Sequence, residues 1–206
     1  PLLSSYAKAV DINDSGDIIA FGNWNTKVEI WQNNGSTWQI MGQPLIDTIN
    51  WGFGFSVSLN ASGDIIAIGA RSAYINGVST GKVFIYQFNG SSWVQLGNTI
   101  NGINQNDQFG QSVSLNNTGD IIAVGANLTI NGQIRVFKNI NQSWTQLGNT
   151  INGSTSGGAF GWPVSISGNG DIFSTGDYYS NNQRGVVRAF SINSLCSSGC
   201  TDSLAL

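Results

Sequence analysis

The chain has 206 residues, of which 40% are hydrophobic and 11% are aromatic, but only 9% are charged. A net charge of −3 with eight scattered Lys and Arg residues argues against a nucleic-acid partner or an acidic membrane surface. No apolar run reaches the roughly 18 residues that a membrane helix needs, so membrane insertion is not expected.

One short passage occurs four times along the chain. The clearest copies are FGFSVSLNASGDIIAIGA from Phe53 and FGQSVSLNNTGDIIAVGA from Phe109, and weaker copies begin at Tyr6 and Phe160. A repeat spacing of about fifty residues is typical of a propeller or a repeat array. The predicted units are residues 6–52, 53–108, 109–159 and 160–192, followed by a C-terminal segment at 193–206.

Each unit predicts four strands, most clearly in the second copy. Large side chains alternate with Gly and Ser from Phe53 to Leu59, which is the period of a strand. A turn cluster at 60–64 precedes the continuous apolar run 65–68, which suits a strand covered on both faces. The other predicted elements are a third strand at 83–86, a hairpin turn at Asn89–Gly90 and a fourth strand at 93–97.

The same order recurs in the other copies. Third strands are predicted at 28–31, 134–137 and 187–190, and fourth strands at 38–42 and 144–148. Four antiparallel strands per repeat, without helical periodicity, predict an all-β fold, a β-propeller of four-stranded blades.

The last copy has no W-x-Q-L-G segment after Phe190, so the fourth blade is predicted to lack its outer strand. Two interpretations follow: the chain is part of a larger propeller of about seven blades, or it is a four-blade unit completed by itself or by other copies.

The motif F-G-x-S-V-S-L-N-x-x-G-D-x-I-A-[IV]-G-A, followed by G-x-[IV]-x-V-[FY], resembles the FG-GAP repeats of integrin α-subunit propellers and of secreted bacterial surface proteins. The end of the chain, GCTDSLAL from Gly199, resembles the start of a G-C-T-D-x-x-A-x-N-Y cysteine repeat of secreted proteins. These resemblances imply display outside the cell, either secreted or on the cell surface, and a role in binding or adhesion.

Many FG-GAP propellers carry a calcium loop, which the resemblance places between the second and third strands. Calcium requires several oxygen ligands converging within one loop. The corresponding loops here contain one acidic residue, Asp177, so neither a metal nor another cofactor is predicted.

Two sets of recurring residues could suggest a functional site, but a structural role in each repeat explains them more simply. The Gly-Asp pairs ending at Asp17, Asp64, Asp120 and Asp171 occur once per unit and are expected to form turns. The recurring Trp38, Trp93 and Trp144 are expected to pack between blades.

The reactive side chains of many enzymes are absent or isolated. The chain has no histidine, which excludes a Ser-His-Asp triad and His-containing zinc sites, and an enzyme is not predicted. Cys196 and Cys200 are candidates for a local disulfide or for two separately paired thiols.

The repeats differ most in the loop from second to third strand, which ranges from 8 residues (Ala20 to Val28) to 16 (Ala67 to Val83). Propeller topology places these loops and the blade-joining loops on one face, where variation on a rigid scaffold is typical of binding. The candidate ligand-binding residues on this face are Trp24, Trp51, Arg71, Tyr74, Tyr178, Tyr179 and Arg184.

Two functions are compatible with this pattern. The first is an extracellular module that binds a glycan or protein through the variable loops. The second is a structural repeat unit of a surface layer, fibre or secreted assembly, completed by other copies or by missing blades.

Overall fold

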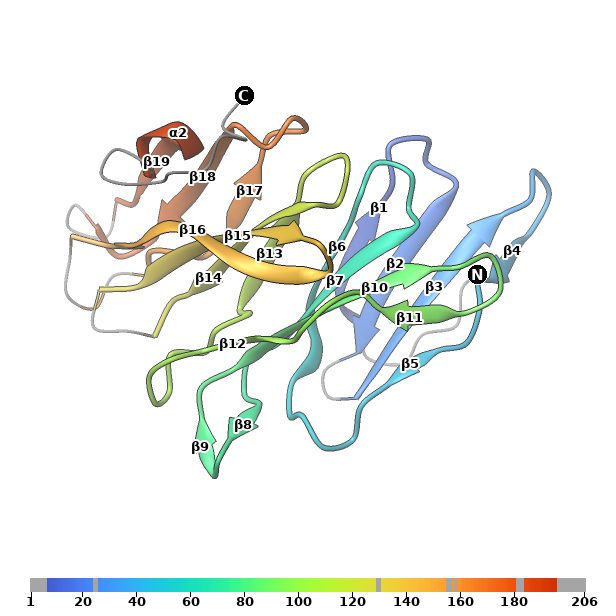
Figure 1. Cartoon of the computed structure of the whole chain (residues 1–206), viewed down its shortest axis with the longest axis horizontal. Helices are drawn as coiled ribbons and strands as arrows, with labels where there is room; N and C mark the ends of the chain where they lie inside the picture. Colours follow the sequence, from blue (N-terminus) through green and yellow to red (C-terminus); the bar gives the residue numbers. More distant parts are fainter. Residues whose placement is uncertain are drawn as a thin grey trace.

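A computed structural model describes residues 7–23, 26–128, 131–154, 157, 159–180 and 184–195. Four antiparallel sheets follow one another along the chain as the blades of a four-blade β-propeller, which confirms the predicted all-β class (Figure 1). A short helix, α2 (Ile192–Leu195), follows the last strand and was not predicted.

Blades 1 and 2 have the same plan, in which the third strand pairs with two short outer strands. The strands of blade 1 are β1 (Ala7–Ile12), β2 (Ile18–Asn23), β3 (Lys27–Asn33), β4 (Trp38–Ile40) and β5 (Leu45–Ile46). Those of blade 2 are β6 (Phe53–Leu59), β7 (Ile65–Ala70), β10 (Lys82–Phe88), β11 (Trp93–Gln95) and β12 (Ile100–Asn101). The long loop of blade 2 forms an extra hairpin from β8 (Tyr74–Ile75) and β9 (Val78–Ser79).

Blade 3 joins the outer segments into one long strand, and blade 4 ends after its third strand in the described part of the chain. The strands of blade 3 are β13 (Ser112–Leu115), β14 (Ile121–Ala126), β15 (Gln133–Ile140) and β16 (Ser143–Asn152). Those of blade 4 are β17 (Val164–Ile166), β18 (Ile172–Asp177) and β19 (Val186–Ser191). The predicted third strands are therefore confirmed, and each is longer than its apolar run.

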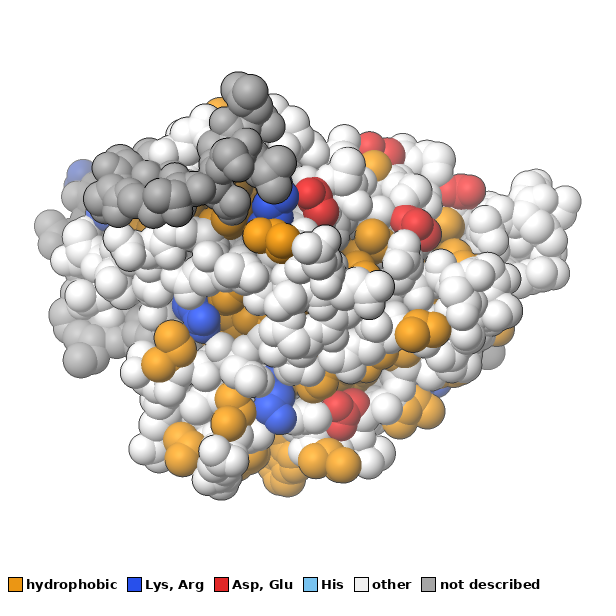
Figure 2. Space-filling model, in the orientation of Figure 1, with side chains coloured by type: hydrophobic (Ala, Val, Ile, Leu, Met, Phe, Trp, Pro, Cys, Tyr) orange, Lys and Arg blue, Asp and Glu red, His pale blue; other side chains and the backbone are white. Residues whose placement is uncertain are grey.

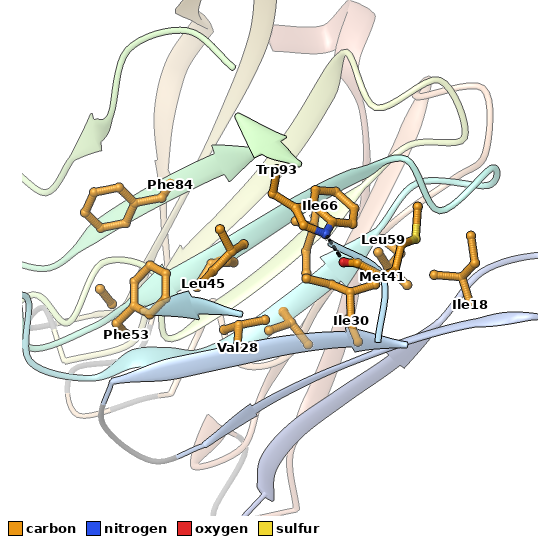
Figure 3. Packing of buried hydrophobic residues seen from close by; sticks show 14 of the residues in the cluster. Ile18, Val28, Ile30, Met41, Leu45, Phe53, Leu59, Ile66, Phe84 and Trp93 are labelled. Carbon is orange, nitrogen blue, oxygen red and sulfur yellow. Dashed lines mark hydrogen bonds between the residues drawn. The ribbon is translucent and has the colours of Figure 1, made fainter. Parts of the chain in front are cut away.

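The hydrophobic cores lie between blades rather than within them. One cluster joins Val28 and Ile30 of blade 1 to Phe53, Ile66 and Phe84 of blade 2, and Figure 3 shows these side chains pointing toward one another. Two further clusters fill the contacts between blades 2 and 3 and between blades 3 and 4. Each blade is thus stabilised mainly by its neighbours.

Of the recurring tryptophans, Trp93 and Trp144 belong to these contacts, as predicted, whereas Trp38 is in none of the three clusters. The indole Nε1 of Trp93 donates to the Met41 carbonyl of the preceding blade at 2.7 Å (Figure 3). Trp144 repeats the bond to the Leu96 carbonyl at 2.9 Å. A buried indole N–H needs an acceptor, and here the acceptor ties the outer strands of adjacent blades together.

Candidate functional site

The propeller has two faces of different character. The turn face carries the short turns 13–17, 60–64, 116–120 and 167–171, between the first and second strands. The loop face carries the connections between the second and third strands and those that join blades. Figure 1 shows the turns at the upper edge and the β8–β9 hairpin at the lower edge.

The Gly-Asp pairs of the turn face are structural, as predicted. In the turn of blade 3, Asn116 Nδ2 donates to Thr118 Oγ1 at 2.9 Å and to Asp120 Oδ1 at 2.8 Å. Asn116 Oδ1 accepts the backbone N–H groups of Asp120 and Ile121 at 3.1 and 3.0 Å. The turns at Asn13 and Asn60 repeat this network. These carboxylates are therefore occupied by turn bonds.

Exposed aromatic side chains gather on the loop face. Among the described residues, those with strongly exposed rings all lie in its connections: Trp51, Tyr74, Trp162, Tyr178 and Tyr179. In the orientation of Figure 2, charged side chains are few. The loop face combines these exposed rings with polar groups and with cations that include Arg71 and Arg184.

Three of the predicted residues lie in neighbouring loops of blade 2. The Arg71 guanidinium stacks on the Phe55 ring, 3.8 Å from its centroid, and Nη1 donates to Gln111 Oε1 at 3.0 Å. The exposed Trp51 belongs to the same group, because its carbonyl accepts the N–H of Ser72 at 3.2 Å. Tyr74 is exposed on the adjacent β8–β9 hairpin.

Burial lowers the pKa of Arg71, but an arginine remains a cation at neutral pH. Its stacking and amide contacts hold the guanidinium at the edge of the loop face. Arginine and tryptophan are both enriched among the residues that dominate binding at protein surfaces.

Two other predicted residues form a second group on blade 4. The rings of Tyr178 and Tyr179 meet edge to face at 4.8 Å, and both are exposed. Arg184 is exposed on the same connection, just before β19. Blade 3 separates this group from the blade 2 group. Trp24, Cys196 and Cys200 lie outside the described residues.

Sequence reasoning missed Phe55 and Gln111, which hold Arg71 in place. A signal was available, because both occupy the third position of the F-G-x motif, where Lys8 and Trp162 stand in the other copies. Side chains at this position contact one another across blades, since the Lys8 ammonium also lies 5.1 Å from the Phe55 centroid.

A polar cavity of about 340 Å³ lies toward the other end of the innermost strands. Its lining includes Asp11, Ser58 and Ser114, which occupy one repeat position. Each accepts a backbone N–H from the next blade; the donor to Asp11 Oδ2 is Leu59, at 2.7 Å. Burial raises the pKa of Asp11, and these hydrogen bonds oppose the rise. These three side chains of the lining are thus already engaged in blade-to-blade bonds.

The acidic residue of the variable loops, Asp177, is buried to 1% exposure. Neither of its carboxylate oxygens has a hydrogen-bond partner in the described structure. The same part of the chain contains no group of three His, Cys, Asp or Glu side chains that could hold a metal. Likewise, none of its helices is long and apolar enough to span a membrane.

No protein-family model matches the sequence, and no curated protein matches it. Solved structures with the same fold do. A proposed 6-phosphogluconolactonase of Bacteroides uniformis is 12% identical with a TM-score of 0.65, and the match covers 90% of this chain and 50% of that one. The hydrazine synthase of Kuenenia stuttgartiensis is 11% identical with the same TM-score, at 94% and 49% coverage. The chain therefore spans about half the length of these structures.

The comparison corrects one prediction. The lack of histidine and of acidic pairs led us to expect a protein without enzymatic activity, but the similar structures include proteins named as enzymes. Identity near 12% shows the shared fold and transfers no reaction to this chain. The expectation was wrong in treating these missing groups as excluding an enzyme.

Proposed function

We propose that the chain is an extracellular binding module that recognises a glycan through its loop face. The observation that carries the proposal is the concentration of strongly exposed aromatic rings on that face, among the described residues. A sugar ring stacks its C–H face on an aromatic ring while its hydroxyl groups bond to amides and a guanidinium. Trp51 and Arg71 supply a ring and a guanidinium beside blade 2, where Gln111 of blade 3 holds the guanidinium, and Tyr178 and Tyr179 supply rings on blade 4.

Location outside the cell rests on the resemblance of the repeat to FG-GAP propellers and of the C-terminal residues to a cysteine repeat of secreted proteins. The low charge of the chain, with 9% charged residues and a net charge of −3, is compatible with a neutral ligand. A rigid scaffold with variable loops suits recognition, since the loops can change without disturbing the blade contacts.

A polysaccharide array tests the proposal. We expect the chain to bind a restricted set of glycans, and Trp51→Ala or Tyr178→Ala to weaken binding about 30-fold, as for a central aromatic contact. Val94→Ala is the matched control, because it removes an exposed apolar side chain from an outer strand. Absence of glycan binding, or equal loss in the control, would refute a loop-face glycan site.

A further inference from the structure

The outward face of blade 4 exposes positions that the other blades bury. On the third strand, Val28, Val83 and Ile134 are each 0% exposed because the next blade covers them. The equivalent residue of blade 4, Val187, is 79% exposed. This face therefore has the composition of a blade contact without a covering blade in the described structure.

The second strand shows the same contrast. An isoleucine at its start packs on a glycine in the turn of the next blade so closely that a Cβ on the glycine would lie within 2.8 Å of the isoleucine Cδ1. These pairs are Ile18 with Gly63, Ile65 with Gly119 and Ile121 with Gly170. The fourth isoleucine, Ile172, is 52% exposed.

Blade 1 exposes the opposite half of this contact. Val57, Val113 and Val164 on the innermost strands of the later blades are each 8% exposed, whereas the equivalent Val10 is 71% exposed. The turn glycine of blade 1, Gly16, has open space where its Cβ would be, with the nearest atom 4.0 Å away. Blade 1 therefore presents the glycine that Ile172 lacks.

Backbone hydrogen bonds between the turns of successive blades leave a donor on the face of blade 4 and an acceptor on the face of blade 1. The Asp14 N–H donates to the Ala61 carbonyl, the Ala61 N–H to Asn117 and the Asn117 N–H to Gly168, at 3.2, 3.1 and 2.9 Å. At one end of this series the Asp14 carbonyl could accept a bond from a preceding turn. At the other end the Gly168 N–H could donate one to a following turn. A further bond of the same kind would join Gly168 to Asp14.

We propose that the outward face of blade 4 binds the open face of blade 1 of a second copy of this chain. Because every copy carries both faces, a two-fold arrangement forms two identical junctions and closes a ring of eight blades. Eight blades lie within the usual propeller range of about four to eight.

This proposal is independent of the glycan site. Each junction repeats a contact that the chain already makes three times, between blades 1 and 2, 2 and 3, and 3 and 4. In the ring the two loop faces lie on the same side, so any ligand site becomes bivalent.

Light scattering after size-exclusion chromatography, over a concentration series, tests the ring. The chain has a mass of 21.9 kDa, and we expect a species of twice that mass. Val187→Lys on blade 4 and Val10→Glu on blade 1 should each weaken dimerisation at least tenfold. In a dimer of either variant, both junctions contain the introduced charge within an apolar contact. Ile103→Lys, an exposed aliphatic on a blade-joining loop, is the matched control and should leave the dimer intact.

Mixing the two face variants distinguishes this arrangement from any other dimer. One junction of the mixed pair then carries both substitutions and the other is native, so the mixture should dimerise more tightly than either variant alone. A wild-type chain that stays monomeric, longer open assemblies, loss of the dimer in the control, or failure of the mixture to recover would each overturn the proposal. Thermal melting checks that each variant is folded, and Val187→Ser with Val10→Ser replaces any that is not.

Discussion

Blades 3 and 4 carry the same repeat in different surroundings. Blade 3 has four strands and a neighbour on each side, whereas blade 4 has three described strands and a neighbour on one side. Ile134 is therefore completely buried, whereas the equivalent Val187 is 79% exposed. Every repeat supplies an apolar surface on its blade, and this surface is buried only where a neighbouring blade covers it.

The largest expected difference is at one glycine of the second strand. A Cβ on Gly125 of blade 3 would lie 1.8 Å from the Gly161 carbonyl of blade 4, so Gly125→Ala forces the blades apart. At the equivalent Gly176, the nearest atom would be 3.4 Å away, which is ordinary contact. We expect Gly125→Ala to cost about 3 kcal/mol in the free energy of unfolding. Gly176→Ala should change it by less than about 0.5 kcal/mol.

Urea denaturation measures both values, at a protein concentration low enough that the chain is monomeric by light scattering. If the two alanines destabilise equally, the close approach between blades 3 and 4 is not what constrains Gly125.

The turns provide a second, smaller contrast. Asn116 of blade 3 is buried and its amide makes four hydrogen bonds, whereas the equivalent Ser167 of blade 4 accepts the Ile172 N–H and donates to Asn169. Asn116→Ala leaves the part-buried N–H groups of Asp120 and Ile121 without this partner and should cost about 2 kcal/mol. Ser167→Ala should cost about 1 kcal/mol or less. Thermal unfolding of the two variants, with Val94→Ala as reference, would contradict this order if Ser167→Ala proved the more damaging.

The regular part of the repeat was predictable because its residues act locally. Period-two patterning located the innermost strand at Phe53–Leu59, and the Asn-Gly signal at Asn89 located a hairpin turn whose Asn89 N–H bonds to the Ser92 carbonyl. The loop face was harder, because its contacts join distant residues. Arg71 is held by Phe55 and by Gln111, which lies on the next blade, and no periodicity links the three.

The open face of blade 4 could not be predicted either. Val187 stands in the same apolar pattern as Ile134, so the sequence gives both the same expected burial. Only the arrangement of blades shows that one is covered and the other is not.

The smallest expected effect on folding stability comes from Asp120 in the turn of blade 3, and it depends on pH. Burial alone would raise the pKa of Asp120, but hydrogen bonds from Thr118 and Asn116, with the Lys138 charge, lower it overall from its ordinary value of 3.8. A carboxyl whose folded pKa is lowered stabilises the fold above its unfolded pKa, and this stability is lost as the pH falls through the folded pKa.

Asp120→Asn should therefore destabilise the chain at neutral pH and flatten the loss of stability below about pH 4. Urea midpoints between neutral pH and pH 3 measure the effect, with Asp14→Asn, in the turn of blade 1, as a matched control. An Asp120→Asn profile that runs parallel to wild type would show that the carboxylate contributes nothing to the turn beyond what an amide supplies. Because Asp120 is partly solvated, the change should be smaller than that of Asn116→Ala, whose buried amide organises the same turn.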